Sequence, residues 1–443
     1  MRAALRLWWA LARRQGPDRL TTGLAVLAFA AVTWALLTTL GGLRAFIDRA
    51  AVDRAAAEPS GMGEVYVVLA VVAAALILVP LITLGGAAAR LAVARRNARM
   101  AALRLAGATT GQVAAMAVAD ALAQAVAGAL AGAALYGVTL PLVALLHFQG
   151  RAFAVHELWV GGWAVSALPA VPLVALVSAL AALRRVAITP LGVARRTGVP
   201  PLSWTRLLPL VVLVGVFVLA ANGFVQVAAI VLLAVLVGTL AGAMWVFNLV
   251  GPWLVSVLGR VVARRARSVP TLLAGRRIAD DPKAAWRSVG GVALVAFVAG
   301  VLSVSPGLAE FGAEEDRHLG IDIATGTAVT LVIAALLAAV STGVTQAGRV
   351  LDQAAEHRAL HLAGTEVATL HAARMRETWI PLLACVGGAT LTALALVSPF
   401  VEVLADAPVG VLLFLGSVVA GCALVLAGTA ASRRMVERAA LSA

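Results

Sequence analysis

Long apolar segments recur along the whole chain and exclude most folds. Each is long enough to cross the hydrocarbon core of a bilayer as a helix, which takes about 20 residues. A chain of 443 residues that is 62% hydrophobic and 13% charged cannot bury so much apolar surface in one soluble core. We therefore predict an all-α polytopic membrane protein with ten transmembrane helices, at about residues 22–46, 64–89, 113–146, 157–183, 205–221, 224–250, 288–308, 324–347, 379–400 and 408–430.

Positive charge between these segments predicts their orientation. Of the 35 Lys and Arg residues, 30 fall in parts that we place inside the cell and five in outside loops. The five are Arg44, Arg49, Arg54, Arg151 and Arg317. Because basic residues gather on the cytosolic side, we expect a multi-pass protein of a bacterial plasma membrane with both termini in the cytosol. The net charge of +14 then does not indicate a nucleic-acid partner, because basic residues that face the anionic headgroups of the lipid bilayer account for it.

Two short stretches, 257 residues apart, look like copies of one part. The first covers residues 99–109 and the second 356–366, and both contain Ala-Leu-x-Leu-Ala-Gly. Each follows a long apolar segment, and a carboxylate, Asp120 or Glu377, follows each copy at the same register. The residues that we assign to this part are Arg99, Met100, Leu103, Arg104, Leu105 and Gly107, and in the second copy Glu356, His357, Leu360, His361, Leu362 and Gly364.

Local signals predict a helix, a turn and a second helix in each copy. No Gly or Pro interrupts residues 87–106 or 349–363, so a membrane helix can continue into water. Gly107 and Gly364 stand where a C-terminal helix cap is expected. In the first copy, Thr109 with Gln112 three residues later is a candidate capping box for the next helix.

The first copy, read together with the apolar helix that opens at Asp120-Ala121, resembles the FtsX-like permeases of MacB-type ABC transporters. In that family this loop is the coupling helix that docks on the ATPase. The basic stretch at 184–196, with its central Pro-Leu, resembles the tail that closes an FtsX-like domain. The resemblance implies two four-helix units, 1–197 and 268–443, joined by a two-helix linker, 198–267. An even number of spans separates the units, so we expect parallel repeats about an axis along the membrane normal.

The resemblance also implies partners. One chain with two units would offer docking sites to two copies of a cytosolic ABC ATPase subunit. The sequence has no Gly-x-x-x-x-Gly-Lys-Ser/Thr loop, so ATP and Mg²⁺ would be bound on the partner, with no cofactor or catalytic residue in this chain. Better-known members carry a large extracytoplasmic domain, whereas this chain has fewer than 20 residues in each equivalent place. Recognition outside the membrane would be minimal, or would come from an extracytoplasmic partner.

Several charged residues have two readings. Asp120 and Glu377 are either paired parts of the coupling apparatus, with a salt bridge to a nearby arginine, or helix-end carboxylates that reach interfacial water. His357 and His361 have a spacing that can bind metal, but no third ligand is evident and a solvated face is favoured. The acidic loop at 310–322 is favoured as a solvated outside loop over a site for Ca²⁺ or a cationic substrate.

The leading interpretation is a permease subunit, itself not an enzyme, that exports or extracts an amphipathic, lipid-like or peptide compound by a lever mechanism. One alternative is an ATP-driven signalling complex that regulates an envelope enzyme. Another, from a different class, is an ion-coupled secondary carrier. The carrier is disfavoured because such proteins place ionisable residues near the bilayer midplane, and no predicted span has one at its centre.

Overall fold

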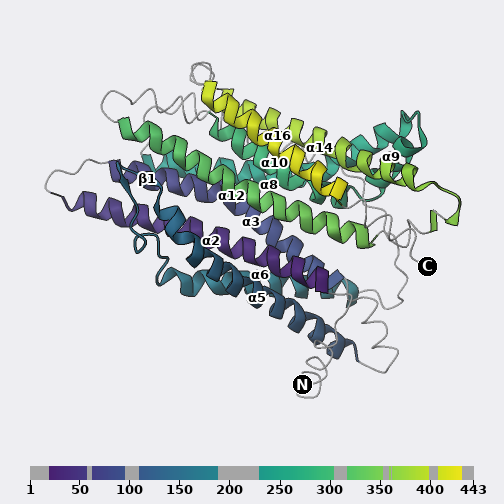
Figure 1. Cartoon of the computed structure of the whole chain (residues 1–443), viewed down its shortest axis with the longest axis horizontal. Helices are drawn as coiled ribbons and strands as arrows, with labels where there is room; N and C mark the ends of the chain where they lie inside the picture. The colour runs from purple at the N-terminus through teal and green to yellow at the C-terminus, as the bar shows by residue number, and fades with distance from the viewer. Residues whose placement is uncertain are drawn as a thin grey trace.

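The computed structural model describes residues 19–56, 62–94, 109–187, 229–303, 317–352, 359–360, 362–398 and 408–431. These residues are almost entirely helical, and the long helices pack side by side into one elongated bundle (Figure 1). The helices are α2 (Arg19–Arg54), α3 (Met62–Ala94), α5 (Thr110–Ala144), α6 (Trp163–Ala187), α8 (Ala229–Arg264), α9 (Val269–Asp280), α10 (Pro282–Leu302), α12 (Arg317–Asp352), α14 (Val367–Val397) and α16 (Pro408–Ala431).

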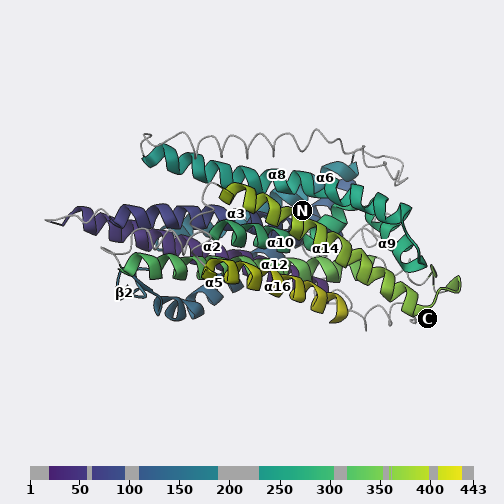
Figure 2. The same ribbon diagram turned by 90° about the horizontal axis from the view of Figure 1, so that it is seen from above.

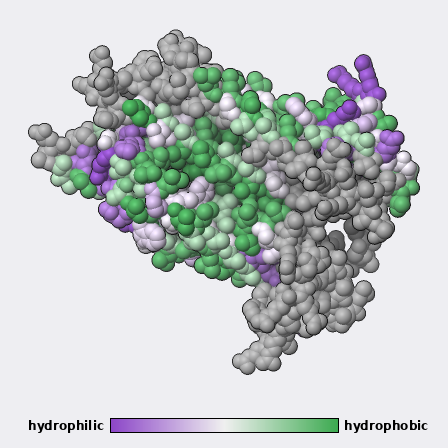
Figure 3. Space-filling model, in the orientation of Figure 1, coloured by the Kyte–Doolittle hydropathy of each residue, from purple (hydrophilic) through white to green (hydrophobic). Residues whose placement is uncertain are grey.

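Seven helices in the described part of the chain are long and apolar enough to cross a membrane: α2, α3, α5, α6, α10, α12 and α14. Large apolar side chains stand exposed on the outside of the bundle, among them Val165 at 78% and Leu391 at 70%. Apolar residues cover much of the middle of the surface, while hydrophilic ones gather toward the ends (Figure 3). The prediction of a polytopic helical membrane protein is therefore confirmed.

The predicted count of ten spans stays a prediction. Helices α8 and α16 lie where two further spans were expected, but they are not among those seven. The predicted span at 205–221 lies outside the described residues. One boundary was wrong: the segment predicted to end at residue 46 continues as helix to Arg54, so Arg44, Arg49 and Arg54 are helical and not in a loop.

Eight of the helices pack in two groups of four. In the first group α2 contacts α3, α5 and α6, and in the second α10 contacts α12, α14 and α16. The groups meet where α12 packs against α3 and α2. Helix α8 runs along one side of the bundle, in contact with α3, α9, α10 and α14 (Figure 2).

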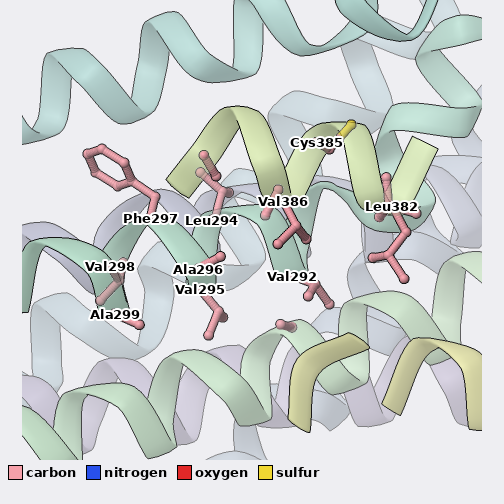
Figure 4. Close-up of a cluster of buried hydrophobic side chains, with 14 of the residues drawn as sticks. Val292, Leu294, Val295, Ala296, Phe297, Val298, Ala299, Leu382, Cys385 and Val386 are labelled. Carbon is pink, nitrogen blue, oxygen red and sulfur yellow. The ribbon is translucent and has the colours of Figure 1, made fainter. Parts of the chain in front are cut away.

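The core of the second group surrounds α10. Every residue from Val292 to Gly300 is buried, so this helix is enclosed on all sides, as a helix with apolar residues around its whole circumference should be. Figure 4 shows part of this cluster, with Leu382 and Val386 of α14 next to residues of α10. A second apolar cluster joins the two groups through residues of α2, α3 and α12, including Phe29, Ile77, Leu84, Ile333 and Leu337.

The two ends of the bundle differ. At one end the connection between α5 and α6 contains the antiparallel strands β1 (His147–Phe148) and β2 (Arg151–Ala152). Gln149 and Gly150 form the turn with φ of 56° and 71°, as a two-residue hairpin with matching twist requires. We call this the hairpin end, and the opposite end, where α9 lies, the α9 end (Figure 1).

A glycine sets the close approach of α2 and α5, which leads to a first prediction. A Cβ atom at Gly132 would lie 2.7 Å from the Cβ of Thr33 and closer still to the carbonyl oxygen of Ala30. We expect Gly132→Ala to lower the free energy of unfolding by about 1–3 kcal/mol, because the helices must move apart. Gly137→Ala is the matched control on the same helix, since a Cβ there meets nothing within 4 Å. Unfolding in mixed micelles measures both, and equal stability of the two variants would contradict the prediction.

Candidate functional site

The predicted coupling residues fall partly outside the described residues. Those that the structure does not describe are Arg99, Met100, Leu103, Arg104, Leu105, Gly107, Glu356, His357 and His361. Leu360, Leu362 and Gly364 of the second copy are described, as is Thr109 at the end of the first. The geometry of the predicted site therefore comes mainly from the second copy and from the helix starts that follow both copies.

The second copy ends in a capped helical turn at the α9 end. Gly364 has φ of +91°, the N–H of Ala363 donates to the carbonyl of Ala359 at 3.0 Å, and the N–H of Thr365 donates to the carbonyl of Leu360 at 3.0 Å. This is the Schellman arrangement, which confirms the predicted cap. Leu362 is 78% exposed, so the turn presents a large apolar side chain immediately before α14 begins.

The helix that follows the first copy begins as predicted. Thr109 is the N-cap of α5: the N–H of Gln112 donates to its hydroxyl at 3.3 Å, and the N–H of Thr109 donates to Gln112 Oε1 at 3.0 Å. The capping box is thus confirmed, and it satisfies two backbone donors that the first helical turn leaves without a partner.

Glu377 is buried in an ion pair. It is 2% exposed on α14, and its Oε2 lies 3.8 Å from Nη1 of Arg277 on α9. Arg374, one turn earlier on α14, is 5% exposed and close enough to Arg277 for their charges to interact. The reading in which Glu377 reaches interfacial water is therefore wrong, and the salt bridge to an arginine is present. The partners could not be identified from the sequence, because α9 and α14 are about 100 residues apart.

A second contact fastens α9 to α14. Nη1 of Arg376 donates to the hydroxyls of Ser268 at 2.7 Å and Thr271 at 2.6 Å, at the start of α9. We call this region the α9–α14 junction, defined by Ser268, Thr271, Arg277, Arg374, Arg376 and Glu377. The residues of the junction on α14, Arg374 to Glu377, lie two to three helical turns after the start of that helix, which follows the capped turn in the chain.

Asp120, the other predicted carboxylate, is half-buried on α5, three turns from the start of the helix. Its neighbour Ala121 is fully buried in a small contact with Ala179 of α6. The two predicted carboxylates therefore differ in environment, and their joint role stays a prediction.

The hairpin end contains a buried arginine that sequence reasoning missed. Arg49 is 6% exposed; its Nε and Nη2 donate to Glu157 Oε2 at 3.1 and 2.7 Å, and Nη1 and Nη2 donate to the carbonyls of Phe148 and Ala152 at 3.0 and 3.1 Å. Burial alone raises the pKa of Glu157, but the hydrogen bond and charge of Arg49, together with Arg151, outweigh it and lower the pKa. Arg49 thus holds the hairpin on α2.

A buried aspartate lies next to this arginine cluster. Asp322 on α12 is 4% exposed, and its Oδ2 accepts hydrogen bonds from the hydroxyl of Tyr66 and from the N–H of Gln149, both at 2.6 Å. The prediction of a solvated acidic loop at 310–322 is therefore wrong from Arg317 onward, where α12 begins, and Asp322 is buried and satisfied by protein donors. Residues 310–316 lie outside the described part.

Within the described residues no group of three His, Cys, Asp or Glu side chains is placed to hold a metal ion. Comparison with known proteins finds no family model, no curated protein and no solved structure that matches this chain. The resemblance to FtsX-like permeases accordingly rests on the sequence motifs, and the chain is assigned here only as a polytopic helical membrane protein.

Proposed function

We propose that this chain is the transmembrane permease subunit of an ATP-driven ABC transporter of the FtsX-like, MacB type. The observation that carries the proposal is the capped turn of the second copy. It presents Leu362 at 78% exposure, and it lies 12 residues before Arg374, the first residue of α14 in the α9–α14 junction. The same turn lies in the duplicated Ala-Leu-x-Leu-Ala-Gly stretch, which resembles the coupling helix that docks on the ATPase in FtsX-like permeases.

The contacts of the α9–α14 junction support a lever mechanism. A movement of the ATPase at the turn around Gly364 would act directly on the start of α14. The pair Arg277–Glu377 and the bonds from Arg376 to Ser268 and Thr271 would then carry it to α9. Helix α14 also packs along the central helix α10, so the same displacement would reach the core of the second group.

The packing of the helices supports two parallel repeats. The first helix of each group contacts the other three, and α3 and α12, the second helices, meet between the groups. Together with the duplicated stretch this favours two FtsX-like units with one ATPase subunit at each. Exposed arginines at the α9 end, among them Arg260, Arg264, Arg265, Arg267 and Arg276, favour a cytosolic location for that end in a bacterial plasma membrane.

The substrate would be an amphipathic, lipid-like or peptide compound taken from the bilayer. A signalling complex that acts on an envelope enzyme would use the same coupling contacts. The transporter and the signalling complex are therefore distinguished by whether a partner outside the membrane is needed. Transport by the reconstituted permease and ATPase alone supports export, and activation of an envelope hydrolase supports signalling.

The second prediction tests the coupling contact. We expect Leu362→Asp to weaken binding of the partner ATPase by about 100-fold or more, because an unpaired charge buried at a contact costs several kcal/mol. Leu360→Asp should act in the same direction. Binding is measured by co-purification with an ABC ATPase subunit produced together with this chain, and coupling by stimulated ATP hydrolysis.

Leu145→Asp is the matched control, because Leu145 is 67% exposed at the opposite end of the bundle. It should leave ATPase binding unchanged. Wild-type binding and hydrolysis in both Leu360→Asp and Leu362→Asp would reject the coupling role of this stretch and, with it, the proposed function.

A further inference from the structure

The interface between the two groups of four helices is apolar through most of its length and polar at the hairpin end. Phe29, Ile77 and Leu84 of the first group pack with Ile333 and Leu337 of α12. At the hairpin end the contact between the groups is polar: Asp322 of α12 accepts hydrogen bonds from Tyr66 of α3 and from Gln149 of the hairpin turn. The two kinds of contact behave differently when helices move.

Apolar side chains can slide past one another, whereas hydrogen bonds to a buried carboxylate require one register. Both donors bind the same oxygen at 2.6 Å, and for the Tyr66 hydroxyl this is the short distance expected of a charge-assisted bond. Neither donor is free to follow α12. Tyr66 stacks on Phe46 with ring centroids 5.8 Å apart, and Arg49 holds the hairpin on α2. A displacement of α12 must therefore break these bonds.

The position of these hydrogen bonds allows them to break and form again. Asp322 lies near the start of α12, at the end of the bundle, so its carboxylate can be hydrated by nearby water when it loses its two donors. At the centre of the bilayer the same separation would leave a charge in hydrocarbon. The contact can thus exist in two states, closed on Tyr66 and Gln149 or open and hydrated.

The sequence positions place this contact where the two units meet. Tyr66 and Asp322 are 256 residues apart, and the duplicated stretches are 257 apart, so the two occupy adjacent positions of the repeated unit on α3 and α12. Helix α12 has no proline between Arg317 and Asp352, and at 36 residues it is about 54 Å long. Its far end, Asp352, lies four residues before the second copy begins at residue 356, so one continuous helix runs from Asp322 to a point close in sequence to the coupling stretch.

We propose that Asp322 is a latch that holds α12 of the second group to α3 and the hairpin of the first, and that it opens when α12 is displaced. The source of that displacement, a movement of the ATPase at the second copy, rests on the proposed function. The latch itself is a property of this chain and can be tested without a partner.

Hydrogen–deuterium exchange at the N–H of Gln149 reads the latch directly in protein reconstituted in lipid nanodiscs. Tyr66→Phe keeps the ring on Phe46 and removes only the hydroxyl that donates to Asp322. If the two hydrogen bonds to Asp322 form and break together, loss of the Tyr66 bond should also weaken the Gln149 bond. Exchange at Gln149 should then rise about tenfold, which corresponds to about 1.4 kcal/mol. Asp322→Asn should raise it at least as much, and the double variant no further than the larger single effect.

Asp48→Asn is the matched control, since Asp48 is an exposed carboxylate at the same end that pairs with Arg44 on its own helix. Its exchange at Gln149 should equal that of the wild type. Unchanged exchange at Gln149 in Tyr66→Phe would show that the two bonds are independent, and would overturn the latch.

A second measurement separates the latch from the proposed function. In the complex with the ATPase, exchange at Gln149 should differ between the ATP-trapped and ADP states. If the ATPase binds and is stimulated but exchange is the same in both states, the latch is a static contact and the proposal fails while the proposed function stands. If no ATPase binds, the proposed function fails while the variants still decide whether Asp322 holds the two groups together.

Discussion

Replacing Glu377 with glutamine should lower the free energy of unfolding by about 3 kcal/mol or more. Removal of one member of a buried ion pair costs this much because the other charge stays buried without it. The carboxylate is 2% exposed and faces Arg277 at 3.8 Å, with Arg374, also buried, close to the same group. In Glu377→Gln two guanidinium charges stay in the α9–α14 junction without the negative charge of Glu377. Equilibrium unfolding in mixed micelles measures the loss.

Two further variants make this prediction specific. Glu366→Gln removes an exposed carboxylate from the start of the same helix, where its side chain makes no capping bond, and should change stability by less than about 0.5 kcal/mol. The double variant Glu377→Leu with Arg277→Leu should recover part of the loss, because an apolar pair can replace a buried ion pair. A Glu377→Gln protein as stable as Glu366→Gln would show that the ion pair is of no structural importance.

Arg49→Leu should destabilise the hairpin end by a similar amount, about 3 kcal/mol. The substitution leaves Glu157 without its main partner and removes the donors to the carbonyls of Phe148 and Ala152. Arg49→Lys should recover little of this, because one ammonium group cannot reproduce the planar arrangement of guanidinium donors. Arg54→Gln, on the same helix, is the control: Arg54 bonds only the carbonyl of Ala50 one turn earlier among the contacts seen.

The same cluster predicts an acid dependence. The pKa of Glu157 is lower in the folded protein than in the unfolded chain, so its contribution to stability is complete above the ordinary glutamate pKa of about 4.3. That contribution should fall as the pH drops below this value through the folded pKa. Arg49→Leu should lose this part of the acid sensitivity, and unfolding between about pH 6 and pH 3 measures it. An identical pH profile in wild type and variant would contradict the pairing.

Buried charge in the described residues is concentrated at the two ends of the bundle. Arg374 and Glu377, with the largely buried Arg277, lie toward the α9 end, and Arg49 and Asp322 lie toward the hairpin end, while the apolar clusters around α10 and between the groups fill the length between them. A charge near the end of a span costs less than one at the bilayer centre, because water and headgroups are close. This distribution allows polar contacts to fix the register of the helices at both ends.

Local features could be predicted because they depend on few neighbouring residues. The membrane character follows from segment length, since only a helix satisfies its own backbone groups in hydrocarbon. The capping box of Thr109 with Gln112 and the cap at Gly364 are each formed within six residues, and both were correct. By contrast, span ends were less certain, because a helix such as α2 continues past its apolar part when its charges find partners.

The sequence by itself determined that the chain forms apolar helices and where several of them begin and end. These features depend only on the length of each apolar segment and on residues within about one helical turn of each other. Only the tertiary structure decided which charges are buried. Arg49 meets Glu157 across 108 residues, and Asp322 meets Tyr66 across 256. In the sequence each of these residues stands at the end of an apolar segment, where a charge exposed to water is expected. Their burial depends on partners that only the packing of distant helices brings within hydrogen-bond distance.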